Sequence, residues 1–183
     1  TRATTSCIWP KRAASARPPV PRFVAFLRAV NVGGRIVKME ALRALFEELG
    51  FQRVETFIAS GNVIFETGSK SEFALQKKIE AHMERSRGYE VATFLRTDAE
   101  LAALAAYEPF AVAQLAAAAS LHVGFLTAPL GAEAEQALMK LKTPDDDFHL
   151  HGRELHWLSR VKQSESKLTN VRIEKAIQAK ISF

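Results

Sequence analysis

The chain has 183 residues, of which 48% are hydrophobic and 25% are charged, and its formal net charge is +5. This composition excludes a largely disordered chain, and no apolar run is long enough to span a bilayer. The single cysteine, Cys7, excludes a disulfide framework and a cysteine metal site, so we expect a cytoplasmic protein without membrane contact.

The first 21 residues differ in composition from everything that follows. They are rich in Thr, Ser, Ala, Arg and Pro and contain no acidic residue, which predicts a disordered basic tail. A targeting segment and a translated leader have the same composition, so both alternatives stay open. Residues 1–22 hold five of the 25 basic residues, which leaves 20 basic against 20 acidic residues in the rest of the chain. The net charge therefore gives little support to nucleic-acid binding.

Residues 22–97 predict one β-α-β-β-α-β unit, the ferredoxin-like or split βαβ arrangement. Apolar runs and helical spacing mark its elements, and a Ser-Gly-Asn turn joins the two middle strands. In chain order these are a strand at 23–30, a helix at 38–49, two strands within 54–66, a helix at 71–85 and a strand at 89–96.

Residues 98–119 are predicted to form a helical connector, in which Asp98 is the N-cap of a first helix and an alanine-rich stretch follows. The same order of elements then starts again in residues 120–183, but the chain ends where a last strand is expected. We therefore predict an α+β fold of two tandem ferredoxin-like units, the second lacking or truncating its last strand. The second set of elements is a strand at 120–126, a helix at 132–142, a hairpin at 148–158 and a helix at 165–180.

The connectivity of the first unit places three loops at one end of its sheet: residues 31–35, 60–62 and 86–88. Gly33 and Gly34 expose backbone N–H groups before a helix, whose N-terminus favours negative charge. This predicts a site for a phosphate or carboxylate. A purely structural tight turn is the alternative. The arginines near that end are Arg28, Arg35, Arg85 and Arg87.

Strand alternation puts Arg28 on the same face as Val24 and Phe26, where an unpaired guanidinium would be costly. It binds the anionic ligand in one interpretation. In the other it forms a structural ion pair with an acid such as Glu55 or Glu66 on a neighbouring strand, or packs its stem across the sheet with its head in water.

Polar side chains gather on one face of the predicted second hairpin. If Gly152 and Arg153 form its turn, His149 lies opposite His156 and His151 lies opposite Glu154. Strand alternation then puts all four side chains on one face of the hairpin. Histidine and carboxylate can bind zinc, yet alternation alone produces such faces. We expect no metal and no cofactor.

RNA recognition motifs share this topology, which makes a nucleic-acid-binding module one alternative function. The predicted third strand offers Phe65 without the basic-glycine-aromatic sequence that stacks bases, so nucleic acid is not the favoured partner. A protein-interaction scaffold is the other alternative, because the sheet face that carries Val24 and Phe26 needs cover.

Three runs resemble the bacterial family catalogued as domain of unknown function 1697. They are Leu-Arg-Ala-Val-Asn-Val-Gly-Gly at 27–34, Ser-Gly-Asn-Val at 60–63 and Ser-Lys-Leu-Thr at 166–169. Ala29 and Val30 depart from the family pattern, and the chain ends in Lys-Ile-Ser-Phe where the family usually has a Thr-x-Arg-Asn-Trp-Asn-Thr-like segment. The resemblance implies two ferredoxin-like halves and candidate positions, without an activity.

The function predicted from the sequence is binding of a small anionic metabolite or nucleotide. Whether a reaction follows, and the oligomeric state, stay open; in a reaction, Arg28 and the loop amides would stabilise negative charge and Asn31 or Ser60 would orient the substrate. The predicted ligand-binding residues are Arg28, Asn31, Gly33, Gly34, Arg35, Ser60, Gly61, Asn62, Lys167 and Thr169.

Overall fold

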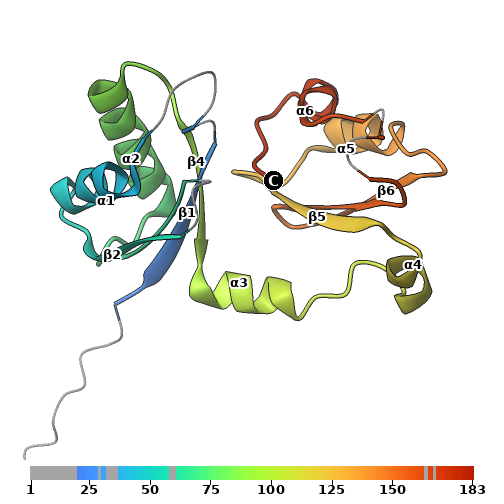
Figure 1. The fold of residues 1–183 in the computed structure, drawn as a ribbon, viewed down its shortest axis with the longest axis horizontal. Helices are drawn as coiled ribbons and strands as arrows, with labels where there is room; N and C mark the ends of the chain where they lie inside the picture. Colours follow the sequence, from blue (N-terminus) through green and yellow to red (C-terminus); the bar gives the residue numbers. More distant parts are fainter. Residues whose placement is uncertain (1–19, 29, 32–36, 58–60, 163–164, 167) are drawn as a thin grey trace, which may run out of the picture.

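The structure is a computed structural model that describes residues 20–28, 30–31, 37–57, 61–162, 165–166 and 168–183. Over these residues the chain has a mixed α/β fold with two sheets and six helices. The elements form two lobes, one at each side of Figure 1, and a helical connector runs along one edge of both. None of the described helices is long and apolar enough to cross a membrane.

The first lobe is a four-stranded antiparallel sheet with the strand order β2-β3-β1-β4. Two helices cover one face of it (Figure 1). Its elements are β1 (Arg22–Arg28), α1 (Met39–Glu48), β2 (Gln52–Phe57), β3 (Asn62–Glu66), α2 (Glu72–Arg87) and β4 (Ala92–Thr97).

Alternation along β1 explains which face the helices cover. Phe23, Ala25 and Leu27 are buried in the helix-side core, whereas the residues between them are only partly buried. Helix α2 begins where the Ser71 side chain accepts a hydrogen bond from the Ala74 amide, and it ends at a left-handed glycine. The sheet therefore has one apolar face under the helices and a second face turned toward the other lobe.

The second lobe is a three-stranded antiparallel sheet with the strand order β5-β7-β6. On the free edge of β5, Phe125 and Ser182 form an isolated antiparallel bridge. Leu155 and Trp157 of β7 pack with the two helices of the lobe in a core of its own. The elements are β5 (Ser120–Phe125), α5 (Ala132–Met139), β6 (Asp146–His151), β7 (Glu154–Ser159) and α6 (Asn170–Ile177).

The connector holds α3 (Asp98–Ala105) and the short α4 (Val112–Ala116). Asp98 is the first residue of α3, and Thr97 is the N-cap because its side chain forms a reciprocal capping box with Glu100. The sequence prediction placed the cap one residue too late, since both residues are good N-caps and only the box decides between them.

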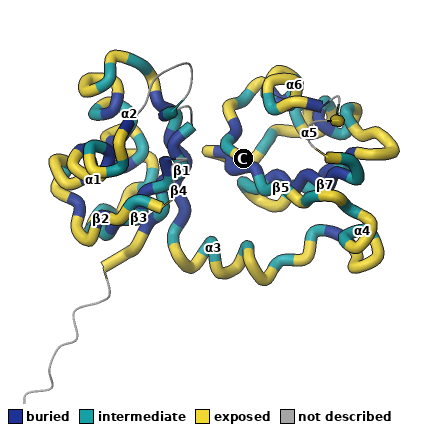
Figure 2. Tube along the Cα trace, in the orientation of Figure 1, coloured by how far each residue is buried: buried dark blue, intermediate teal, exposed yellow. Residues whose placement is uncertain are grey.

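The lobes meet through the sheet faces that carry no helix. Phe26 of β1 stacks on Phe125 of β5 with ring centroids 4.1 Å apart. Figure 2 shows that β4 and β7 are largely buried and that β1 and β5 are buried in part, whereas the outer turns of the helices are exposed. The cover expected for this sheet face thus comes from the second lobe at Phe26.

Candidate functional site

Described residues that flank the three predicted loop segments contact one another at one end of the first sheet, whereas most of the first loop and part of the second lie outside the described residues. The Tyr89 hydroxyl donates a hydrogen bond to the Val30 carbonyl oxygen at 3.1 Å, and a Cβ added to Gly61 would lie 3.2 Å from Val30 Cγ1. Asn31 Oδ1 accepts a hydrogen bond from the Val37 amide at 2.7 Å, so the Asn31 side chain ties the two ends of its own loop. We call this end of the sheet the rim.

Arg28 forms a two-pronged ion pair with Glu174 of α6, in the other lobe. The Nη1–Oε1 and Nη2–Oε2 distances are both 2.7 Å, and the side chains are 31% and 17% exposed. The partners expected from neighbouring strands, Glu55 and Glu66, pair instead with Arg22 and Arg53. The structural ion pair considered for Arg28 therefore forms, but with a different acid, because Glu174 is 146 residues away in sequence and only the packing of the lobes brings it to Arg28.

Arg28 and Asn62 lie on the same face of the sheet. Asn62 is the register partner of both Phe26 and Phe57, and Arg28 follows Phe26 by one full strand repeat. Asn62 is half-buried and Phe57 is exposed. The rim thus presents a guanidinium, an amide and an aromatic ring on the face opposite the helices.

The remaining predicted positions divide into two groups. Thr169 is the N-cap of α6, where its Oγ1 accepts from the Arg172 amide at 3.3 Å, so its hydroxyl is used in holding the helix that carries Glu174. Five predicted positions lie outside the described residues: Gly33, Gly34, Arg35, Ser60 and Lys167.

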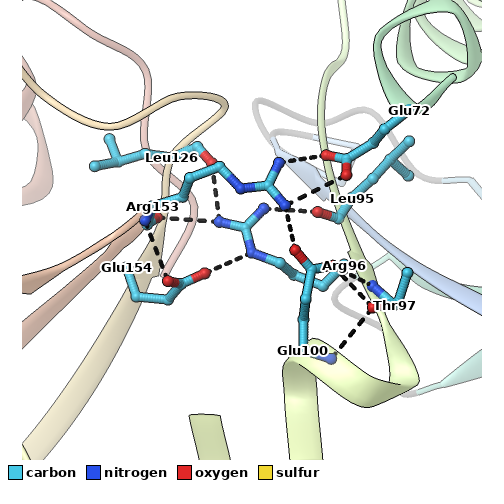
Figure 3. Close-up of polar contacts among 8 residues, drawn as sticks. All are labelled: Glu72, Leu95, Arg96, Thr97, Glu100, Leu126, Arg153 and Glu154. Carbon is cyan, nitrogen blue, oxygen red and sulfur yellow. Dashed lines mark hydrogen bonds and ion pairs between the residues drawn. The ribbon is translucent and has the colours of Figure 1, made fainter. Parts of the chain in front are cut away.

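A second polar centre, which the sequence reasoning missed, joins the lobes around Arg96 of β4 (Figure 3). Arg96 is only 1% exposed, and its Nε donates to Glu154 Oε1 at 2.6 Å. Its other nitrogens donate to the carbonyl oxygens of Leu95 at 2.6 Å, Leu126 at 2.9 Å and Arg153 at 3.0 Å. The local signal was the one charged residue of a strand that otherwise holds only apolar residues and threonine.

Arg153, at the turn of the second hairpin, extends this network back to the first lobe. Its guanidinium donates to both carboxylate oxygens of Glu72 and to Glu100 Oε1 at 2.6 Å (Figure 3). Burial lowers the pKa of Arg153, but the hydrogen bonds and charges of the two carboxylates outweigh it and raise the pKa. Burial raises the pKa of Glu100, but the hydrogen bonds from Thr97 and Arg153 and the Arg153 charge outweigh it and lower the pKa, so the carboxylate stays ionised.

The predicted face of the second hairpin forms with the expected register. His149 pairs with His156, and His151 pairs with Glu154. Tyr107 of the connector packs on this face: its hydroxyl is 2.7 Å from His149 Nε2, and its ring stacks on His151 with centroids 4.1 Å apart. A pocket of about 280 Å³ lies beside them, lined in part by Tyr107, His151 and Glu154.

His156 lies beneath this contact and is 2% exposed. Neither of its ring nitrogens has a hydrogen-bond partner in the described part of the chain. Desolvation, and then the charges of His149 and His151, lower the pKa of His156 against the opposing effect of Glu154. Among the residues that the structure describes, no group of three or more His, Cys, Asp or Glu side chains is placed to hold a metal ion.

Comparison with known proteins places this architecture in a family. Residues 20–156 match the model described as "Protein of unknown function (DUF1697)". The fold resembles that of the conserved bacterial protein SP0830 from Streptococcus pneumoniae, with a TM-score of 0.67 and 21% identity over 90% of this chain and 92% of the other. Comparison with curated proteins gave no match. The chain belongs to the DUF1697 family of proteins of unknown function.

Proposed function

We propose that the protein binds a small ligand bearing a phosphate or carboxylate group at the rim, with Arg28 as the cationic contact. The observation that carries this proposal is the two-pronged pairing of Arg28 with Glu174 at a partly exposed position. An arginine guanidinium binds a carboxylate or phosphate through two parallel hydrogen bonds, and here it binds the Glu174 carboxylate in this way.

Ligand binding then requires Arg28 to exchange one carboxylate for another. Ion pairs between partly exposed groups contribute about 1 kcal/mol or less, so an incoming anion with several oxygens can compete for the guanidinium. Asn62 lies on the same face as Arg28, and in this proposal its side-chain amide donates to the ligand. Asn31 is a poorer candidate, because the hydrogen bond from Val37 to its Oδ1 holds the side chain within its own loop.

The backbone amides of Gly33 and Gly34, together with Arg35, Ser60 and Lys167, complete the proposed site. They lie outside the described residues, and their roles rest on the sequence pattern alone. Arg87 adds positive charge close to the rim: it ends α2 two residues before Tyr89, and its Nε atom is buried without a hydrogen-bond partner in the described chain.

We also infer that each lobe is one ferredoxin-like unit, over residues 22–97 and 120–183, with residues 98–119 as the connector. The order β2-β3-β1-β4 of the first sheet corresponds to β6-β7-β5 of the second, and the bridge of Ser182 to Phe125 stands where β4 stands in the first. The nucleic-acid and scaffold alternatives have less support. Both need a free sheet face for the partner to contact, and Phe26 on that face already stacks on Phe125.

A thermal-shift panel of nucleotides, sugar phosphates, di- and tricarboxylates and short RNA tests the proposal. At least one small anion is expected to raise the Tm of the wild type, and Arg28→Ala is expected to weaken its binding about tenfold or more, as loss of a charge-assisted hydrogen bond predicts. Arg43→Ala is the matched control, because Arg43 pairs with Glu47 within α1, away from the rim. A panel without any hit, or equal loss in both variants, would refute the site.

A further inference from the structure

The connector is held on the second sheet by a small group of aromatic and histidine side chains. Tyr107 bonds His149 and stacks on His151, and Phe110 meets the His149 ring edge-on with centroids 6.2 Å apart. Phe110 is buried. We call these contacts, together with the underlying His156, the connector latch.

His156 makes the latch sensitive to protons for a geometric reason. A protonated imidazole has two N–H donors, and in a buried site each unsatisfied donor is costly. Both ring nitrogens of His156 lack partners in the described chain, the facing residue on β5 is the apolar Val123, and the Tyr107 ring lies 5.5 Å from the His156 ring. In the arrangement seen here, His156 is 2% exposed, so water has little access to solvate its charged form.

The charged groups around His156 do not remove this penalty. His149 and His151 on β6 face it and repel a proton. Glu154 on its own strand attracts a proton, but Arg96 already binds that carboxylate at 2.6 Å.

The other acidic group on this face of β6 is also engaged, since Asp147 pairs with Lys142 at 2.6 Å. The connector contributes Tyr107, whose hydroxyl is bonded to His149. None of the packed elements therefore offers His156 a free carboxylate in the described chain.

We propose that the connector latch is a proton-operated switch, in which protonation of the buried histidine releases residues 106–119 from the second sheet and exposes the sheet face. This inference concerns the second lobe and does not depend on the anion site. The pH at which the switch opens follows from burial, because burial lowers the pKa of His156 in the closed form. The closed form is therefore favoured above the ordinary histidine pKa of about 6.5 and loses stability as the pH falls below it.

Hydrogen exchange of the whole chain at about pH 7.5 and about pH 5, corrected for intrinsic rates, tests the switch. The protection of residues 106–119 is expected to fall about tenfold or more at the lower pH, while α2 keeps its protection. His156→Phe, which fills the site with an uncharged ring, is expected to remove the pH response. His82→Gln on α2 is the matched control and is expected to respond as the wild type does.

Three results would overturn the switch: unchanged protection of residues 106–119 in the wild type, an equal fall in α2, or a full response in His156→Phe. If His156→Phe does not fold, His149→Gln provides the same test, because it keeps a polar partner for the Tyr107 hydroxyl and removes one repelling charge. Its opening is expected at a lower pH than that of the wild type, and an unchanged opening pH would contradict the switch.

Discussion

Two arginines on the same face of the first sheet hold the lobes together in different environments. Arg96 is buried, and its donors reach Glu154 and three backbone carbonyl oxygens. Arg28 is partly exposed and reaches one carboxylate. Because a buried guanidinium with fixed partners has no water to replace them, Arg96 suits a structural role, and Arg28 suits an exchangeable one.

Arg96→Met is expected to destabilise the protein by about 3–5 kcal/mol, because it leaves Glu154 poorly solvated without its cation. Urea unfolding measures this change. The matched variant Arg53→Met removes an arginine that is 78% exposed and bonded to Glu66, and is expected to cost less than about 1 kcal/mol. Equal costs for the two variants would mean that the Arg96 network does not stabilise the lobe interface.

Sequence reasoning succeeded with single residues where the partner is local. The hairpin turn at Gly152 and Arg153 set the pairing of His149 with His156, because a two-residue turn fixes the register. It failed where the partner is distant: nothing in the local pattern of Arg28 or Arg96 identifies Glu174 or Glu154, since each contact depends on how the lobes pack.

At the scale of elements, strand β5 and the C-terminal segment pack without spare room. A Cβ added at Gly124 would lie 2.5 Å from Ile181 Cδ1 and 2.8 Å from Phe183 Cε1. Glycine is required here for close approach, and its φ angle is not in the left-handed region. The close packing keeps residues 181–183 beside β5, where Ser182 bonds Phe125 through two backbone hydrogen bonds.

Gly124→Ala is expected to lower the free energy of unfolding by about 1–3 kcal/mol through overpacking. Gly68→Ala, where a Cβ meets no atom within 4 Å, is the control and is expected to change stability little. The double variant Gly124→Ala/Ile181→Val is expected to cost less than the sum of its single changes, because valine lacks the Cδ1 atom. Additive costs in thermal unfolding would show that the clash does not set the stability of this edge.

The helices and strands were largely predictable because their cores follow period 2 and period 3.6. Phe23, Ala25 and Leu27 alternate along β1, and Leu42, Leu45 and Phe46 share the buried side of α1. The cap of α3 was misplaced by one residue because Thr97 and Asp98 are both good N-caps. The contact of Tyr107 with His149 and His151 was not predicted, because the sequence of the connector has no periodic pattern that indicates the surface on which it packs.

At the scale of the whole molecule, several ion pairs link the two lobes. In addition to Arg28 with Glu174 and the Arg96 network, Lys180 pairs with Glu90 at 2.5 Å. The proposed ligand and Glu174 compete for the same guanidinium, so ligand binding at the rim and contact between the lobes are linked through one residue.

Calorimetric titration of Glu174→Gln with an anion that shifts the wild-type Tm tests the central claim most directly. Glutamine keeps the size of the side chain and removes its charge, so its hold on Arg28 weakens, and the affinity is expected to rise about fivefold, which corresponds to about 1 kcal/mol. Glu47→Gln, at the control pair on α1, is expected to leave the affinity unchanged. An affinity that stays the same or falls in Glu174→Gln would contradict the account, because Arg28 would then serve only to join the lobes.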